Sequence, residues 1–192
     1  MYLRKFYVNL VFALVVLGLG FVAVSSAIKM RANHAGTPES SVNRLPQNHP
    51  PTDMSKELAE LEQLSAKDPG NANYRTRIGN IYYDMDQYGK AAVYYKESLE
   101  LNPRDPNVET DLAVCYHYLG ENDKSLEILD KVLQYSPNFA QAMFNKGIVL
   151  ISGKGDKKGG IAVWERLLRE HPDFPRRAEL QQSIDQLRSS LQ

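Results

Sequence analysis

Residues 72–105, ANYRTRIGNIYYDMDQYGKAAVYYKESLELNPRD, decide the fold. Small, aromatic and proline residues stand at fixed intervals within this stretch: Gly79, Tyr82, Ala91, Tyr95 and Pro103. The interval from Pro69 to Pro103 is 34 residues, and a fixed period of about 20–50 residues is typical of repeat proteins. The stretch is therefore expected to be one unit of an array.

Two further units follow with the same spacing. Residues 106–139 carry Ala113, Tyr116, Ser125, Leu129 and Pro137. Residues 140–174 carry Gly147, Leu150, Gly160, Trp164 and Pro172. The third unit is one residue longer than the others, and we expect the extra residue in a turn over 153–159.

These positions resemble the tetratricopeptide repeat. The resemblance implies that each unit is a pair of antiparallel helices, whose small residues let the backbones approach while the large residues fill the space alongside. Proline ends the second helix, because it cannot continue a helix interior. One pair cannot cover its own apolar face, so the units must stack. The expected fold is all-α, a tetratricopeptide-repeat α-α solenoid of three helix pairs.

Flanking helices are expected at both ends of this array. Residues 54–69 carry Leu58, Leu61 and Leu64 at helical spacing and predict a half-repeat or cap before the first unit. Residues 175–191 carry apolar residues at helical spacing with polar residues between them, which predicts a capping helix after the third unit. The repeat domain would then span residues 54–192.

The amino-terminal residues have a different composition. From Leu10 to Ile28 the chain has 19 uncharged residues, which as a helix would span about 28 Å, close to the roughly 30 Å hydrocarbon core of a bilayer. With its basic flanks, this segment predicts a transmembrane anchor over residues 1–31. Residues 32–53 are proline-rich and predict a flexible linker. A cleavable signal peptide is the alternative interpretation.

A short basic amino-terminal tail usually remains in the cytoplasm. The sequence therefore predicts a single-pass membrane protein of a Gram-negative inner membrane, with its repeat domain in the periplasm.

Charge and cysteine content exclude several functional classes. Lysine plus arginine and aspartate plus glutamate each number 23, so the formal net charge is zero, which argues against nucleic-acid binding through a basic surface. The single cysteine, Cys115, excludes an intrachain disulfide and a multi-cysteine metal site. Cys115 and His117 are two positions apart on a predicted helix, too far around it to act as a nucleophile–base pair. We expect no enzyme activity, catalytic residue, metal, cofactor or small-molecule substrate.

The resemblance implies that a protein or peptide partner binds the concave face lined by the first helix of each pair. The positions expected to contact it are Thr76, Asn80, Tyr83, Val114, His117, Tyr118, Phe144, Ile148 and Ile151. Apolar and aromatic residues predominate, which favours an amphipathic helix or an extended apolar segment as the ligand. For Ile148 and Ile151, packing against the carboxy-terminal cap is an equally weighted alternative.

Family members that bind chaperones hold a terminal carboxylate with lysine and asparagine in this groove. Asn80 and Asn145 are present here, but the lysines are not. Capture of an acidic chain terminus is therefore not expected.

Three functional hypotheses follow. The first is a non-catalytic, membrane-anchored scaffold that recruits another protein. The second rests on Leu58 and Leu61, the stretch IAVWERLL at 161–168, and His171 with Pro172, which look like the tetratricopeptide domains of bacterial cytochrome c maturation proteins. That resemblance implies a chaperone for the unfolded tail of an apocytochrome. The third is a structural assembly factor of a pilus, secretion or outer-membrane machine.

Overall fold

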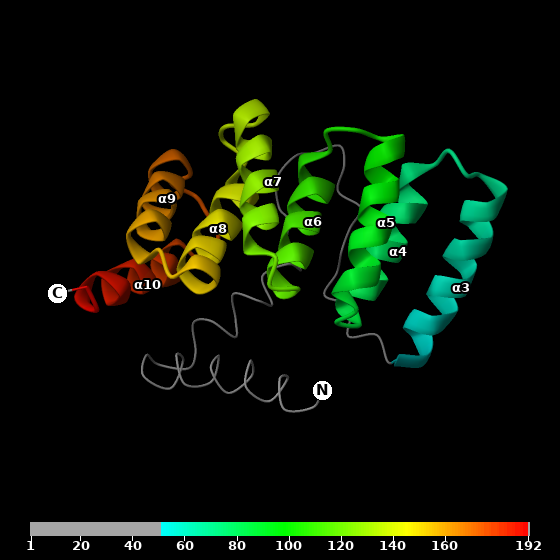
Figure 1. Cartoon of the computed structure of the whole chain (residues 1–192), viewed down its shortest axis with the longest axis horizontal. Helices are drawn as coiled ribbons and strands as arrows, with labels where there is room; N and C mark the ends of the chain where they lie inside the picture. Colours follow the sequence, from blue (N-terminus) through cyan, green and yellow to red (C-terminus); the bar gives the residue numbers. More distant parts are fainter. Residues whose placement is uncertain (1–50, 192) are drawn as a thin grey trace. The chain divides into compact units, whose positions relative to one another are not determined.

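The computed structural model describes residues 51–191, which form eight α-helices and one π-helical segment, with no strand among them (Figure 1). The elements are α3 (Pro51–Lys67), α4 (Ala72–Asp84), α5 (Tyr88–Leu101), α6 (Pro106–Tyr118), α7 (Asn122–Tyr135), α8 (Ala140–Ile148), η2 (Val149–Gly153), α9 (Lys157–Glu170) and α10 (Arg177–Ser189).

The helices form three antiparallel pairs that stand side by side in chain order (Figure 1). We call α4, α6 and α8 the A helices, and α5, α7 and α9 the B helices. Each helix packs mainly on its neighbours in the chain, and α6 also contacts α8. The turns from A to B lie along one edge of the array, which we call the A–B edge, and the turns from B to A lie along the other. The predicted all-α solenoid of helix pairs is confirmed.

The close approach of paired helices depends on the predicted small residues. A Cβ atom at Gly79 would lie 2.8 Å from the Tyr95 ring, and one at Gly147 would lie 2.0 Å from the Trp164 indole nitrogen. An aromatic ring from the B helix therefore lies directly across the A helix in the first and third repeats. The second repeat has Ala113 and Leu129 at these positions, and both are fully buried.

The core is a series of small clusters along the array. Leu61 of α3 packs with Ile78 and Ile81 of α4. The next cluster joins α5 to α6 through residues that include Tyr95 and Cys115. A further cluster joins α6, α7, α8 and η2. Each cluster is built by consecutive elements, as expected for a stack in which one pair covers the next.

The additional residue of the third repeat does not lie in the turn, contrary to the prediction. All three A–B turns contain three residues, and the middle residue is left-handed in each, with φ of 57° at Asp86, 81° at Gly120 and 71° at Gly155. The extra residue is accommodated by η2, in which the end of the A helix widens to π-helical geometry. An insertion inside a helix is absorbed this way because one wider turn keeps the backbone hydrogen-bonded.

The flanking helices occupy the predicted places with small differences. Helix α3 begins at Pro51, inside the stretch predicted as linker, and proline is favoured in the first turn of a helix. Its Leu61 is buried, but Leu64 is exposed. Helix α10 buries Leu180 and Ile184 against α9.

Within residues 51–191, no helix is both long enough and apolar enough to cross a membrane. This finding contradicts the predicted localisation as a single-pass membrane protein with a periplasmic domain. The segment on which that prediction was based, residues 10–28, lies outside the described residues, as does most of the predicted linker.

Candidate functional site

A row of side chains crosses all three repeats near the carboxyl ends of the A helices. Tyr83 of α4 meets Tyr118 of α6 edge to face, with ring centroids 6.0 Å apart and planes at 71°. One repeat further, the Nε2 atom of His117 lies 3.3 Å from the hydroxyl of Ser152 in η2. Counted from the first residue of each A helix, each contact joins the twelfth position of one repeat to the thirteenth position of the next. The row therefore follows from the repeat geometry.

Tyr88, at the start of α5, extends this row toward the A–B edge. Its ring stacks on Tyr118 with centroids 4.3 Å apart and planes at 9°, and it also meets Tyr83 edge to face at 5.3 Å. The Tyr88 hydroxyl donates to a carboxylate oxygen of Asp86 at 2.6 Å. Burial of the ring and then this hydrogen bond raise the pKa of Tyr88 above its ordinary value.

His117 belongs to a hydrogen-bonded junction between the second and third repeats. Its Nδ1 atom lies 2.6 Å from Oδ1 of Asn122, and Nδ2 of Asn122 donates to the carbonyl oxygen of Gly153 at 3.1 Å. Because an amide oxygen only accepts, Nδ1 of His117 must carry the proton. A Cβ atom at Gly153 would lie 2.4 Å from the Asn122 amide oxygen, so this junction requires glycine there.

Three residues predicted to contact a ligand point into the fold instead. The Thr76 hydroxyl lies 2.7 Å from that of Ser98 on α5. Asn80 is 6% exposed, and its Oδ1 accepts a hydrogen bond from the Tyr95 hydroxyl at 2.8 Å. The third of these residues is Phe144, which is 9% exposed. All three are turned inward for the same reason. Thr76 and Phe144 stand at the fifth position of their repeats and Asn80 at the ninth, and these positions flank the glycine at which the paired helices approach most closely.

Phe144 is 9% exposed and packs between two aromatic rings. Its ring lies parallel to Trp164 at 6.0 Å and near Phe174 at 5.9 Å. Its carbonyl oxygen accepts the indole hydrogen bond of Trp164 at 2.9 Å. Phe144 is therefore part of the third repeat's core, which corrects the prediction that its side chain is offered to a ligand.

The other predicted contact residues are half-buried, and they are Tyr83, Val114, His117, Tyr118, Ile148 and Ile151. They come from α4, α6, α8 and η2. Ile151 also rests against α9, because a Cβ atom at Gly160 would lie 2.4 Å from its Cγ1 atom. We call these six residues the A-helix row.

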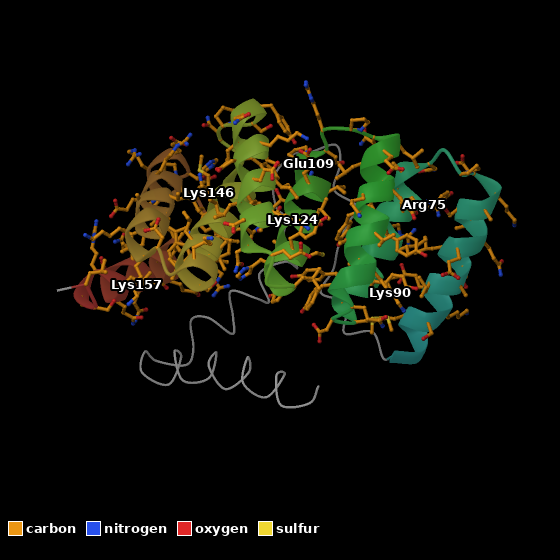
Figure 2. The ribbon with its side chains drawn as sticks, viewed as in Figure 1. Arg75, Lys90, Glu109, Lys124, Lys146 and Lys157 are labelled. Carbon is orange, nitrogen blue, oxygen red and sulfur yellow. The ribbon has the colours of Figure 1, made fainter. Side chains whose placement is uncertain are left out.

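The described residues include no cluster of three or more histidine, cysteine, aspartate or glutamate side chains suited to a metal. Cys115 is fully buried in the core, while His117 is bonded to Asn122. Among the described residues, one charged residue is buried, Glu109 of α6, which Figure 2 labels near the edge opposite the A–B turns. Glu109 also lines a hollow together with Leu112 and Lys131. It lies 3.3 Å from the Lys131 ammonium and accepts a hydrogen bond from Tyr135, so its charge is already satisfied within the fold.

Several residues around the row were not expected from the sequence, among them Met85, Tyr88, Leu119 and Asn122. A usable signal was present for two of them. Met85 and Leu119 stand at the same position of consecutive repeats, in turns where polar residues would suffice. The contacts of Tyr88 and Asn122 depend on how neighbouring repeats stack, which spacing alone does not specify.

Comparison with known proteins gives the context of this geometry. Curated relatives include U-box domain-containing protein 70 of Oryza sativa subsp. japonica, which is 34% identical over 94 residues, or 49% of this chain and 11% of the relative. Hsp70-Hsp90 organizing protein 2 of Arabidopsis thaliana is 31% identical over 90 residues, covering 47% of this chain and 16% of the relative. This chain therefore spans less than a fifth of those relatives' length.

Solved structures share the fold at low sequence identity. The crystal structure of MamA has a TM-score of 0.60 at 17% identity, covering 72% of this chain and 88% of that one. The first repeat domain of Spaghetti (RPAP3), bound to the HSP90 peptide SRMEEVD, has a TM-score of 0.55 at 18% identity, covering 62% and 92%.

Family models of the tetratricopeptide repeat match residues 72–105, 110–139 and 141–173, which together are just over half of the chain. These matches coincide with the three helix pairs, and the small and large residues at the helix crossings are those that the repeat requires. The chain belongs to the tetratricopeptide repeat family.

Proposed function

We propose that this chain is a non-catalytic module that binds a segment of a partner protein across the A-helix row. The observation that carries the proposal is the row itself, which presents half-buried aromatic and aliphatic side chains on α4, α6, α8 and η2, with Tyr83 and Tyr118 in contact between the first two repeats. Burying such apolar surface against a ligand is favourable by about 25 cal/mol for each Å² removed from water.

Relatives support this proposal. Three curated relatives are Hsp70-Hsp90 organizing proteins by name, and one solved domain of the same fold holds an HSP90 peptide. Hsp70, Hsp90 and the HSP90 peptide are named for these relatives and not for this chain. For this chain, the residues of the row indicate which class of ligand is expected.

The expected ligand is apolar and has no acidic terminus to anchor. The A-helix row contains no lysine or arginine. Arg77 of α4 is already paired, because its guanidinium lies 2.8 Å from Glu57 of α3. Thr76 and Asn80 are bonded inside the first repeat. An acidic peptide such as SRMEEVD would therefore meet little positive charge, and we expect an amphipathic helix or extended apolar segment instead.

The test begins with a photo-crosslinking residue at Val114, which is half-buried in the middle of the row. Val93 is the matched control, because it is an exposed valine on helix α5 outside the row. We expect a defined protein segment to be cross-linked from position 114 and not from position 93. Adducts from position 93 alone would show that the row is not the binding surface.

A synthetic peptide of the captured segment then measures affinity. Val114→Asp is expected to weaken binding at least about tenfold, since it places a charge in a desolvated contact. Val93→Asp should leave the affinity unchanged, and thermal unfolding of both variants checks that the fold is intact. Equal affinities for the two variants would contradict the proposal.

The identity of the captured partner also distinguishes between the two more specific functional hypotheses, a cytochrome-maturation chaperone and an assembly factor. A haem-free cytochrome tail would support the cytochrome-maturation chaperone. A single stable component of a pilus, secretion or outer-membrane machine would support the assembly factor.

A further inference from the structure

A cluster of apolar side chains lies on the A–B edge of the first two repeats. Met85 and Leu119 directly follow α4 and α6, and they are 37% and 45% exposed. They stand at equivalent positions of consecutive repeats and next to the three tyrosines described above. We call Tyr83, Met85, Tyr88, Tyr118 and Leu119 the edge patch. Met85 and Leu119 are close to Tyr83 and Tyr118 in the chain, and exposed apolar side chains gathered on one edge are typical of an interaction site.

The edge patch is held in place before any ligand arrives. Tyr88 stacks on Tyr118, and Tyr83 meets both rings edge to face. Tyr88 is also fixed by its hydrogen bond to Asp86. A rigid aromatic surface loses little conformational entropy on binding, so more of the contact energy appears as affinity.

The charge at this patch is negative. The carboxylate of Asp86 is exposed, accepts a hydrogen bond from Tyr88, and has no ion pair within the described residues. Two lysines close to the patch in the chain, Lys90 and Lys124, place their ammonium groups over other tyrosine rings (Figure 2). The Lys90 nitrogen is 5.0 Å from the centre of the Tyr82 ring, and the Lys124 nitrogen is 5.3 Å from that of Tyr116. Lys124 is also paired with Glu121. The Tyr88 ring of the edge patch therefore adjoins a carboxylate that forms no ion pair with a lysine or arginine of residues 51–191.

We propose that the edge patch binds a basic apolar segment of a partner protein, with an arginine over the tyrosine rings and against Asp86 and an adjacent aliphatic side chain on Met85 and Leu119. The planar guanidinium fits this arrangement because it stacks on aromatic rings and also pairs with a carboxylate. The proposal deepens the function proposed above, since Tyr83 and Tyr118 belong to both surfaces. It names the chemistry of the ligand at one end of the row.

The first experiment uses the full chain and two short fluorescein-labelled peptides. In one, leucine and arginine alternate with serine, and in its twin each arginine is replaced by glutamate. Fluorescence anisotropy is expected to show at least about tenfold tighter binding of the arginine peptide, because ion pairing and stacking act together. Equal binding of the two peptides would overturn the proposal.

Matched variants locate the contact. Asp86→Asn keeps an acceptor for Tyr88 and tolerates the left-handed backbone, because asparagine adopts that conformation readily. It should weaken the arginine peptide about fivefold, and Leu119→Ser should have a similar effect. The controls are Asp173→Asn, an exposed aspartate far along the chain, and Leu101→Ser, a 43% exposed leucine on the opposite edge. Equal losses in the controls would attribute binding to net charge or general hydrophobicity and overturn the proposal.

The same peptides distinguish this inference from the broader proposed function. If Asp86→Asn weakens binding and Val114→Asp does not, the edge patch binds on its own and the A-helix row does not. If Val114→Asp weakens binding of the captured partner segment while Asp86→Asn has no effect on any peptide, the row stands and the edge patch fails.

A photo-crosslinking residue at position 119 identifies the occupant. Adducts with the arginine peptide support the proposal. Adducts that instead join two copies of the chain, or position 119 to another part of the same chain, would assign the patch to self-association or to an internal contact and overturn it.

Discussion

At the scale of single residues, the absence of a side chain at Gly147 allows the Trp164 ring to lie across helix α8. The indole nitrogen then reaches the carbonyl oxygen of Phe144, and the two rings pack in parallel. The same arrangement holds Tyr95 over Gly79 in the first repeat, where the hydroxyl reaches Asn80. In both repeats the glycine permits the close approach, and the polar tip of the aromatic residue fixes the ring.

Gly147→Ala should therefore destabilise the third repeat severely. The new methyl group would lie 2.0 Å from the Trp164 nitrogen, so the ring must leave its place, at a cost of about 3 kcal/mol from overpacking and the lost hydrogen bond. Trp164 is the only tryptophan, so its fluorescence during urea unfolding reports the change. Gly89→Ala is the control, because no atom lies within 4 Å of the added carbon. A variant at position 147 as stable as that control would contradict the account.

A second prediction concerns Tyr135 in alkaline solution. Burial and the hydrogen bond to Glu109 raise the pKa of the Tyr135 hydroxyl. The folded state therefore favours the neutral phenol, and the resulting stability is complete below the ordinary tyrosine pKa of about 10 and is lost as the pH rises above it.

Tyr135→Phe should lower stability near neutral pH by about 1–2 kcal/mol, because Glu109 loses a partner, and should make the further loss above pH 10 less steep. Urea midpoints measured across this range, with Tyr74→Phe as the control, check both effects. Parallel pH profiles of the two variants would show that Tyr135 does not titrate with unfolding.

At the scale of secondary structure, the third repeat differs from the prediction in where its extra residue lies. The spacing of Gly79, Tyr82 and their equivalents carried the resemblance to the tetratricopeptide repeat, and that resemblance predicted the helix pairs. The extra residue was expected in a turn, since turns tolerate insertions. The turn kept its three residues and its left-handed glycine, and the helix end widened instead.

The candidate surface was predictable only in part. The resemblance to the tetratricopeptide repeat indicated which positions of the A helices face the groove, and it treated the fifth and ninth positions as open. Asn80 and Phe144 are covered by Tyr95 and Trp164, whose rings reach across from the paired helix. The edge patch depends on contacts such as Tyr88 on Tyr118, which exist only after two repeats have stacked.

The π-helical segment leads to a prediction of its own. Gly153→Ala would place a methyl group 2.4 Å from the Asn122 amide oxygen and separate Asn122 from His117 and from η2. We expect faster amide hydrogen exchange in η2 and the first turn of α7, with a loss of about 1–3 kcal/mol in stability. Gly70→Ala, which meets no atom within 4 Å, is the control. Unchanged exchange in both elements would show that the junction does not couple the repeats.

At the scale of the whole molecule, stability is expected to be distributed as in a one-dimensional stack. Helix α10 packs on α9, helix α3 packs on α4, and each buried cluster joins consecutive elements. Interactions that reach only nearest neighbours make the two ends respond separately to damage. The two capping helices therefore provide matched sites for a test.

Ile184→Ala in α10 and Leu61→Ala in α3 both remove most of a buried aliphatic side chain, at a cost of about 2–4 kcal/mol each. The first variant should lose hydrogen-exchange protection in α8, α9 and α10 while α4 and α5 keep theirs, and Trp164 fluorescence should change at lower urea than helical circular dichroism. The second should lose protection in α3 and α4 and leave Trp164 unaffected until global unfolding. If both variants lose protection evenly along residues 51–191, the three repeats unfold as one cooperative unit, and coupling between them exceeds what nearest-neighbour packing supplies.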